Sequence, residues 1–204
     1  RSSACKPMTD FMDFRTLLHL ARDTLVNPRE GAAQVLRIAL PTQALVLLFA
    51  LAVVGSMIVS EITTLVFSSA TADPFEALSP IVSGVIQAGI LYFVIHAIHR
   101  IGMFFGGKGT LHGAFILVIW LQFILIVVQL AQVVIIMIFP PLAPMITILV
   151  LGLFFWLLVN FIAVLHGFTM LWQVAVATLL STFVLIFTLS FILVTLGIVP
   201  ARFQ

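Results

Sequence analysis

Long apolar runs, each separated from the next by a short polar or glycine-rich break, fill the chain from residue 41 onward. A helix needs about 20 consecutive apolar residues to cross a bilayer core. The pattern predicts five spans, at about residues 41–60, 80–99, 112–138, 145–166 and 171–197. We therefore expect an all-α fold, a polytopic transmembrane helical bundle over residues 41–199. A count of four would follow if the last two runs formed a re-entrant pair, although both are long enough to cross.

The segment before the first span is amphipathic. Over residues 10–25, apolar side chains recur at steps of three and four and so share one helix face: Phe11, Phe14, Leu18, Ala21 and Leu25. Asn27-Pro28-Arg29-Glu30 then predicts the capped start of a second helix that runs toward Pro41. We expect residues 10–40 to form cytoplasmic or interfacial amphipathic helices in the headgroup plane, with a short cytosolic hairpin as the alternative.

The basic residues predict which side of the membrane each loop faces, because cytoplasmic loops carry an excess of Lys and Arg. Every Lys and Arg except Arg202 either precedes the first span or lies between the second and third. With five spans, the N-terminus is then cytoplasmic and the C-terminal tail, residues 200–204, is extracytoplasmic. Residues 1–9 are expected to be a tag remnant or a disordered extension, and no cleavable signal peptide is visible.

Composition supports a membrane protein and argues against several other classes. Hydrophobic residues make up 63% of the chain and charged residues 8%, whereas a soluble domain carries about 25% charged residues. No Asp, Glu, Lys or Arg occurs between Gly109 and Ala201. The net charge of +2 is too small to suggest a nucleic-acid partner. The single cysteine, Cys5, excludes an intrachain disulfide.

The layout resembles bacterial members of the Yip1 family. It shares with them a cytosolic N-terminal segment, the helix start at Asn27–Glu30, five closely linked spans, and the turn Gly106–Thr110 (GGKGT) between the second and third spans. The resemblance covers residues 24–198. It implies a five-span protein of the bacterial inner membrane that has no cofactor and no established catalytic site, and that acts through protein or lipid contacts.

The chain also departs from that family in two places. The third span, AFILVIWLQFILIVVQL, lacks the Tyr-and-Pro element that often follows there. The DLYGP-like motif of eukaryotic relatives is missing as well. A role in vesicle traffic tied to that motif is therefore not implied for this chain.

Gly102–Gly109, GMFFGGKG, comes close to the phosphate-binding loop GxxxxGK[ST]. Gly109 stands where that motif needs a hydroxyl to hold magnesium, and no strand precedes the segment. We therefore expect a flexible turn with Lys108 at the cytoplasmic interface, and no nucleotide partner.

Four histidines map to the predicted cytoplasmic ends of the spans: His96, His99, His112 and His166. His96 and His99 are three residues apart and can share a helix face. Imidazoles gathered in this way could bind a transition metal, but no cysteine or carboxylate accompanies them at membrane depth. Interfacial or interhelical hydrogen bonding is therefore favoured, with a metal site as the alternative.

Amide side chains mark the third and fourth spans. Gln122, Gln129 and Gln132 share one face of the third span, and Asn160 lies in the fourth. A transporter would need such groups along a substrate path, but amides in lipid usually pair with other helices. Transporters also tend to carry ionisable groups at the midplane, and the spans contain no such Asp, Glu, Lys or Arg. Interhelical pairing is therefore the favoured role.

Small residues four apart permit two helices to approach closely. Gly84 and Ala88 form such a pair in the second span, and Ala177 and Ser181 form one in the fifth. The pattern fits contacts within the bundle and contacts with a partner equally well.

The sequence contains no catalytic constellation and favours a non-enzymatic, Yip1-like membrane protein. Such a protein would be a scaffold, assembly factor or accessory subunit of a larger complex, in contact with lipids and other integral membrane proteins. A small transporter or channel lined by Gln122, Gln129, Gln132 and Asn160 is the first alternative. A metal-dependent intramembrane enzyme that uses the four histidines is the second.

Overall fold

The structure is a computed structural model that describes residues 14–67 and 80–195, and the regular structure of these residues is helical throughout. The predicted N-terminal extension and C-terminal tail lie outside the described residues. The helices follow in the order α1 (Phe14–Val26), α2 (Pro28–Leu36), α3 (Thr42–Phe67), α4 (Pro80–Phe104), α5 (Leu111–Ile138), the short 3₁₀ helix η2 (Pro140–Leu142), α6 (Ala143–His166) and α7 (Leu171–Thr195).

Five of the described helices, α3 to α7, are long and apolar enough to cross a membrane, which confirms the predicted fold class. Two of them are longer than predicted. α3 continues past Glu61 to Phe67, and α4 continues past Arg100 to Phe104. The 26 residues of α3 correspond to about 39 Å, which exceeds a hydrocarbon core of about 30 Å. A charged residue near such a helix end therefore meets water or headgroups without ending the helix.

The two short helices α1 and α2 form an N-terminal hairpin, and α2 ends earlier than the sequence-based expectation. Residues 10–13 of the predicted first helix, Phe11 included, lie outside the described residues. Asn27 is the N-cap of α2 and Pro28 is in its first turn, but the Asn27 side chain makes no capping hydrogen bond. α2 ends at Leu36 instead of running toward Pro41. Arg37 is the C-cap of α2, and a short non-helical segment then leads to α3. Pro41 disfavours helical geometry at the residue before it and so keeps the two helices separate.

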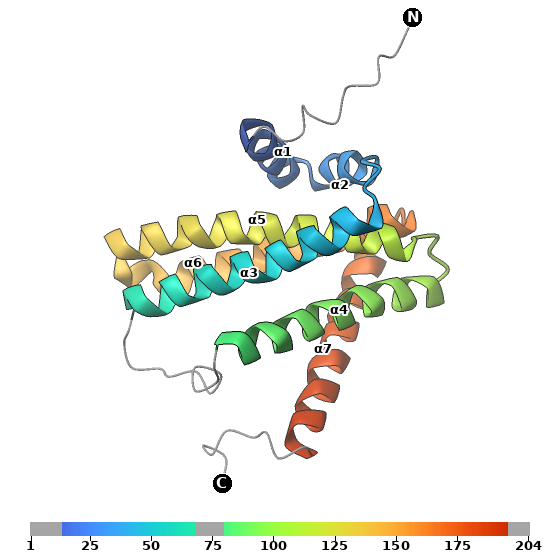
Figure 1. Cartoon of the computed structure of the whole chain (residues 1–204). Coiled ribbons are helices and arrows are strands. Elements are labelled where there is room, and N and C mark those ends of the chain that lie inside the picture. Colours follow the sequence, from blue (N-terminus) through green and yellow to red (C-terminus); the bar gives the residue numbers. More distant parts are fainter. Residues whose placement is uncertain (1–13, 68–79, 196–204) are drawn as a thin grey trace, which may run out of the picture.

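The hairpin lies along the sides of α5 and α6 (Figure 1). Its buried face is centred on Ala21 and Thr24 of α1 and on Ala32 and Val35 of α2, whereas Leu18 of the predicted apolar face is 37% exposed. The two helices cross closely, because a Cβ on Gly31 would overlap the Thr24 side chain.

A hydrogen bond ties the hairpin to the bundle. The Trp120 indole N–H donates to Thr24 Oγ1 at 3.3 Å, and the Thr24 hydroxyl donates to the Leu20 carbonyl at 2.6 Å. Trp120 lies nine residues into α5, about 14 Å from its first residue. The 28 residues of α5 span about 42 Å, whereas a hydrocarbon core is about 30 Å thick. The end of α5 that begins at Leu111 can therefore extend beyond the core.

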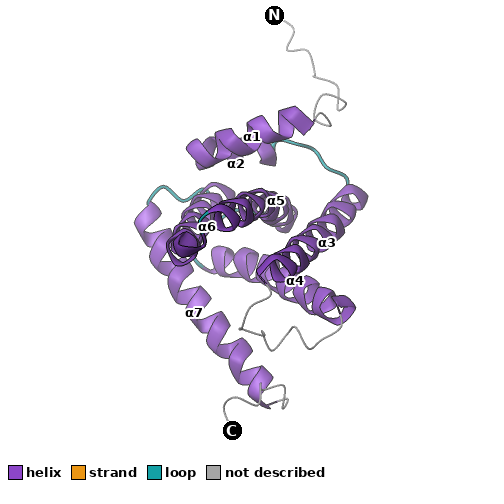
Figure 2. Cartoon of the chain, turned by 90° about the vertical axis from the view of Figure 1, so that its left-hand side faces the viewer, coloured by secondary structure: helices purple, strands orange, loops and turns teal. Residues whose placement is uncertain are grey.

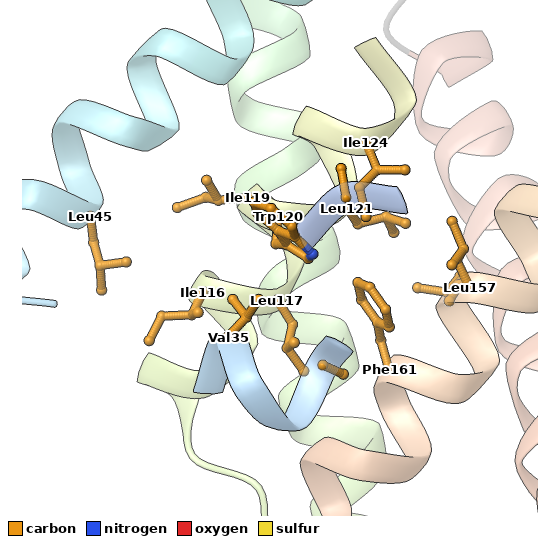
Figure 3. Packing of buried hydrophobic residues seen from close by; sticks show 13 residues of the cluster. Val35, Leu45, Ile116, Leu117, Ile119, Trp120, Leu121, Ile124, Leu157 and Phe161 are labelled. Carbon is orange, nitrogen blue, oxygen red and sulfur yellow. The ribbon is translucent and has the colours of Figure 1, made fainter. Parts of the chain in front are cut away.

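Helices α3, α5 and α6 run side by side and hold the main core (Figure 1). Figure 3 shows its centre, where Trp120 and Ile124 of α5 face Leu157 and Phe161 of α6 and Val35 of the hairpin. Leu157 and Ile124 are almost fully buried, at 0% and 1% exposure. The N-terminal hairpin is thus part of the same core as the membrane helices.

Helices α4 and α7 are the least buried spans. In an apolar stretch of 18 residues taken from each of these two helices, 11% of the residues are buried, whereas 44% are buried in the corresponding stretch of α5. α7 packs against α6 and slants away from α5 and α3, as Figure 2 shows. One side of the bundle is therefore loosely packed, and the candidate site lies there.

Candidate binding cleft

A cleft of about 570 Å³ separates α4 from α7, and α6 closes it from behind. Ligand pockets in proteins measure about 300–1,000 Å³, so the size suits a small molecule or part of a lipid. The lining residues are mostly apolar and come from α4 (Ile90, Phe93, Val94, Ala97, Ile98, Ile101, Gly102), from the α4–α5 turn (Phe105), from α6 (Phe154, Leu158, Ile162), from the α6–α7 link (Phe168) and from α7 (Gln173, Val174, Ala177, Thr178, Ser181, Thr182, Leu185, Ile186).

The cleft occupies only one half of the bundle. It runs from Ile90 to Gly102 on α4 and from Gln173 to Ile186 on α7, the ends of these helices nearest the α4–α5 turn and the α6–α7 link. We call this end of the bundle the basic end, because the exposed cations Arg100 and Lys108 lie there.

The polar side chains of the cleft all come from α7. Gln173, Thr178, Ser181 and Thr182 line it, and Thr178 is itself buried. Ala177 and Ser181, the predicted close-approach pair of the fifth span, also face this cleft. Small and hydroxyl-bearing residues on this face leave room for a ligand and offer it a few hydrogen-bonding groups.

The cleft ends at the basic end beside a buried histidine, His166, which is 2% exposed. Three glycines enclose its ring, since a Cβ on Gly102, Gly107 or Gly109 would overlap the imidazole. The ring also stacks on Phe168, with ring centroids 5.7 Å apart. Gly102 and Phe168 line the cleft as well, so this glycine cradle and the cleft share a wall.

Hydrogen bonds fix the α4–α5 turn onto the end of α6. The Gly109 N–H donates to His166 Nδ1 at 3.2 Å, and the Lys108 N–H donates to the His166 carbonyl at 3.2 Å. Because Nδ1 accepts a hydrogen bond, a neutral ring carries its proton on Nε2. Nε2 is buried and has no hydrogen-bond partner among the described residues.

The turn therefore has a structural role that the near-match to a phosphate-binding loop did not suggest. Gly106, with φ of 82°, adopts the left-handed conformation that glycine favours. The glycines that follow it hold an imidazole where a phosphate-binding loop would hold a nucleotide.

The four histidines of the metal hypothesis lie in different surroundings. His99 lies on α4, and its Nδ1 atom is buried without a hydrogen-bond partner among the described residues. His96 Nδ1 is 2.9 Å from the Tyr92 carbonyl, and its ring packs on Tyr92, while His112 is exposed in the first turn of α5. Among the described residues, no group of three or more His, Cys, Asp or Glu side chains is placed to hold a metal ion.

The amides of the third and fourth spans do not line the cleft. Gln132 Nε2 donates to Thr147 Oγ1 at 3.3 Å and so joins α5 to α6. The Asn160 amide donates to the Trp156 carbonyl of its own helix at 2.7 Å. Gln122 and Gln129 are both partly exposed on α5.

A second polar contact joins α3 to α4. The Gln87 amide donates to Ser56 Oγ at 2.6 Å, and the Ser56 hydroxyl donates to the Val53 carbonyl at 2.9 Å. Gly84, one turn away, is buried where a Cβ would overlap the Met57 side chain. Ala88, the other small residue of this predicted close-approach pair, is partly buried.

With the geometry established, the chain can be compared with known proteins. A family model described as the Yip1 domain matches residues 22–192. The chain belongs to the Yip1 family. As a Yip1-family protein with five membrane-spanning helices, it is a multi-pass integral membrane protein. No curated protein and no solved structure matches it.

Sequence reasoning identified the family but missed the cleft and the glycine cradle of this Yip1 protein. A signal for the cradle was present, because Gly102, Gly107 and Gly109 crowd one short turn and His166 ends a neighbouring span. The signal for the cleft was weaker, since it consisted only of the hydroxyl-bearing residues along one face of α7.

Proposed function

We propose that this protein is non-enzymatic and works by binding within the bacterial inner membrane, as a scaffold or accessory subunit of a larger membrane complex. The observation that carries the proposal is the loosely packed side of the bundle, where the two least buried spans, α4 and α7, border one apolar cleft. A helix that is apolar all around is normally buried by neighbours or by lipid. α7 has α6 as its main neighbour in this chain, which leaves its other faces for partners.

The outer face of α7 is well suited to such a contact. Leu180, Phe183 and Phe187 are between 63% and 72% exposed. Aromatic residues are enriched in the cores of protein interfaces, and small residues such as Ala177 and Ser181 let a neighbouring group come close. The predicted cytoplasmic N-terminus would place the hairpin and the basic end on the cytoplasmic side.

Site-specific photo-crosslinking in native membranes tests the proposal. A photoreactive amino acid replaces Phe183 on α7 or, as a control, Leu47 on α3, because each side chain is 72% exposed. We expect discrete, reproducible adducts with the same integral membrane protein from position 183 and none from position 47. Adducts with lipid alone from both positions would contradict a protein-binding role for α7.

A further inference from the structure

The dimensions of the cleft indicate what kind of molecule fills it. Along α4 the lining runs from Ile90 to Gly102, a length of about 18 Å at 1.5 Å per residue, and Phe105 in the α4–α5 turn extends it. One leaflet of the hydrocarbon core is about 15 Å deep, half of the full 30 Å. The cleft therefore matches one leaflet and its headgroup region, whereas a partner transmembrane helix would need a groove along the whole core.

The chemistry of the lining agrees with an acyl chain. The walls from α4 and α6 are aliphatic and aromatic. The polar side chains all stand on α7: Gln173, Thr178, Ser181 and Thr182. Gln173 is at the basic end of this row, where a lipid carries its glycerol ester and headgroup. The walls from α4 and α6 are thus apolar along their whole length, whereas α7 offers an amide at the interface and hydroxyl groups deeper in the cleft.

Charge at the mouth of the cleft favours an anionic headgroup. Arg100 lies two residues before Gly102 and Lys108 lies three residues after Phe105, and both cations are exposed. No Asp or Glu follows Glu76 in the sequence, so neither the α4–α5 turn nor the α6–α7 link carries a carboxylate. The acids of the hairpin, Asp23 on α1 and Glu30 on α2, are exposed and do not line the cleft.

We propose that the cleft between α4, α6 and α7 binds one anionic phospholipid from the leaflet at the basic end. Its acyl chain lies between α4 and α7, and its phosphate meets Arg100 and Lys108 above the His166 glycine cradle. The inference rests on the proposed function for placing binding on the α4–α7 side, and it names a ligand class for that site. The bound lipid supports α7 at its angle to the bundle.

Native mass spectrometry of the full chain in mild detergent tests the proposal with two probes, phosphatidylglycerol and phosphatidylcholine with identical acyl chains. We expect phosphatidylglycerol to bind more tightly. Replacing Arg100 and Lys108 together by Gln should weaken its binding by about fivefold per residue, the weight of one basic side chain near an anionic surface. The matched control replaces Arg22 and Arg29, exposed on the hairpin, and should change little.

A second pair of variants tests the cleft itself. Ala177→Trp fills the cleft and should abolish most lipid adducts, whereas Leu180→Trp, on the same helix but outside the lining and 63% exposed, should retain them. A phosphatidylglycerol with a photoreactive acyl chain gives a readout on the unaltered protein. We expect it to label residues 90–105 and 173–186 in preference to α3.

Three results would overturn the lipid proposal: equal binding of the two lipids, equal loss in the two tryptophan variants, or uniform photolabelling of the spans. These results are independent of the protein adducts expected from position 183. A protein adduct without lipid selectivity would leave the scaffold role standing, and selective lipid binding without a protein adduct would leave only the lipid site.

Discussion

At the scale of single residues, the His166 imidazole at the basic end is enclosed by three glycines. Gly102→Ala puts a Cβ into this ring, and overpacking a closed site costs about 1–3 kcal/mol. We therefore expect a lower temperature of thermal unfolding in detergent. Gly89→Ala on the same helix is the control, because its Cβ meets nothing within 4 Å and a helical Gly→Ala change gains up to about 1 kcal/mol. A Gly102→Ala protein as stable as the control would refute the cradle.

The hydrogen bond between Trp120 and Thr24 makes a second prediction at this scale. Thr24 is 0% exposed, and Thr24→Val removes the oxygen that accepts from the indole N–H. A buried donor left unpaired costs about 1–3 kcal/mol, so the hairpin should open more often and trypsin should cleave faster after Arg22 and Arg29. Thr16→Val, at an exposed position of the same helix, should leave the cleavage rate unchanged. Unchanged cleavage in both variants would show that this bond does not hold the hairpin.

At the scale of helices, the contact between α3 and α4 depends on a polar pair within apolar surroundings. Ser56→Ala and Gln87→Leu, made singly and together, form a double-mutant cycle whose coupling is expected at about 0.6 kcal/mol and at most about 1.7 kcal/mol. Unfolding in a denaturing detergent measures each stability. Ser60, exposed on α3, supplies a control cycle with Gln87 that should show no coupling. Equal coupling in the two cycles would mean that the Ser56 contact contributes nothing specific.

The helices also show which structural features can be predicted from the sequence and which cannot. The five spans were predictable because each apolar run is long enough to cross and ends at a charged, glycine or proline break. Their packing was not, because a helix that is apolar on every side carries no amphipathic signal to say which face meets a neighbour. The hairpin does carry such a signal, yet its buried face includes the polar residue Thr24. The hydroxyl of Thr24 accepts a hydrogen bond from Trp120, which is far away in the sequence, so the local pattern could not indicate that Thr24 is buried. The cleft and the glycine cradle likewise exist only through contacts between distant segments.

At the scale of the whole molecule, the bundle is asymmetric. The hairpin, α3, α5 and α6 share one core, while α4 and α7 border the cleft on the other side. The hairpin and the cleft both lie toward the basic end, so the two features that distinguish this fold from a plain bundle lie toward the same membrane surface. A partner or lipid bound at the cleft would therefore contact α4 and α7, the two spans that the rest of the chain buries least.

The orientation of the whole chain can be tested with one cysteine at each end of α5. In a Cys5→Ser background, which removes the single native cysteine, Lys108→Cys marks the α4–α5 turn and Leu142→Cys, 40% exposed, marks the α5–α6 turn. Because cytoplasmic loops are rich in basic residues, a membrane-impermeant maleimide should label Leu142→Cys in intact bacterial spheroplasts and Lys108→Cys only after lysis. The opposite pattern would reverse the predicted orientation. Since α5 alone connects the two positions, labelling of both from one side would instead mean that α5 does not cross the membrane.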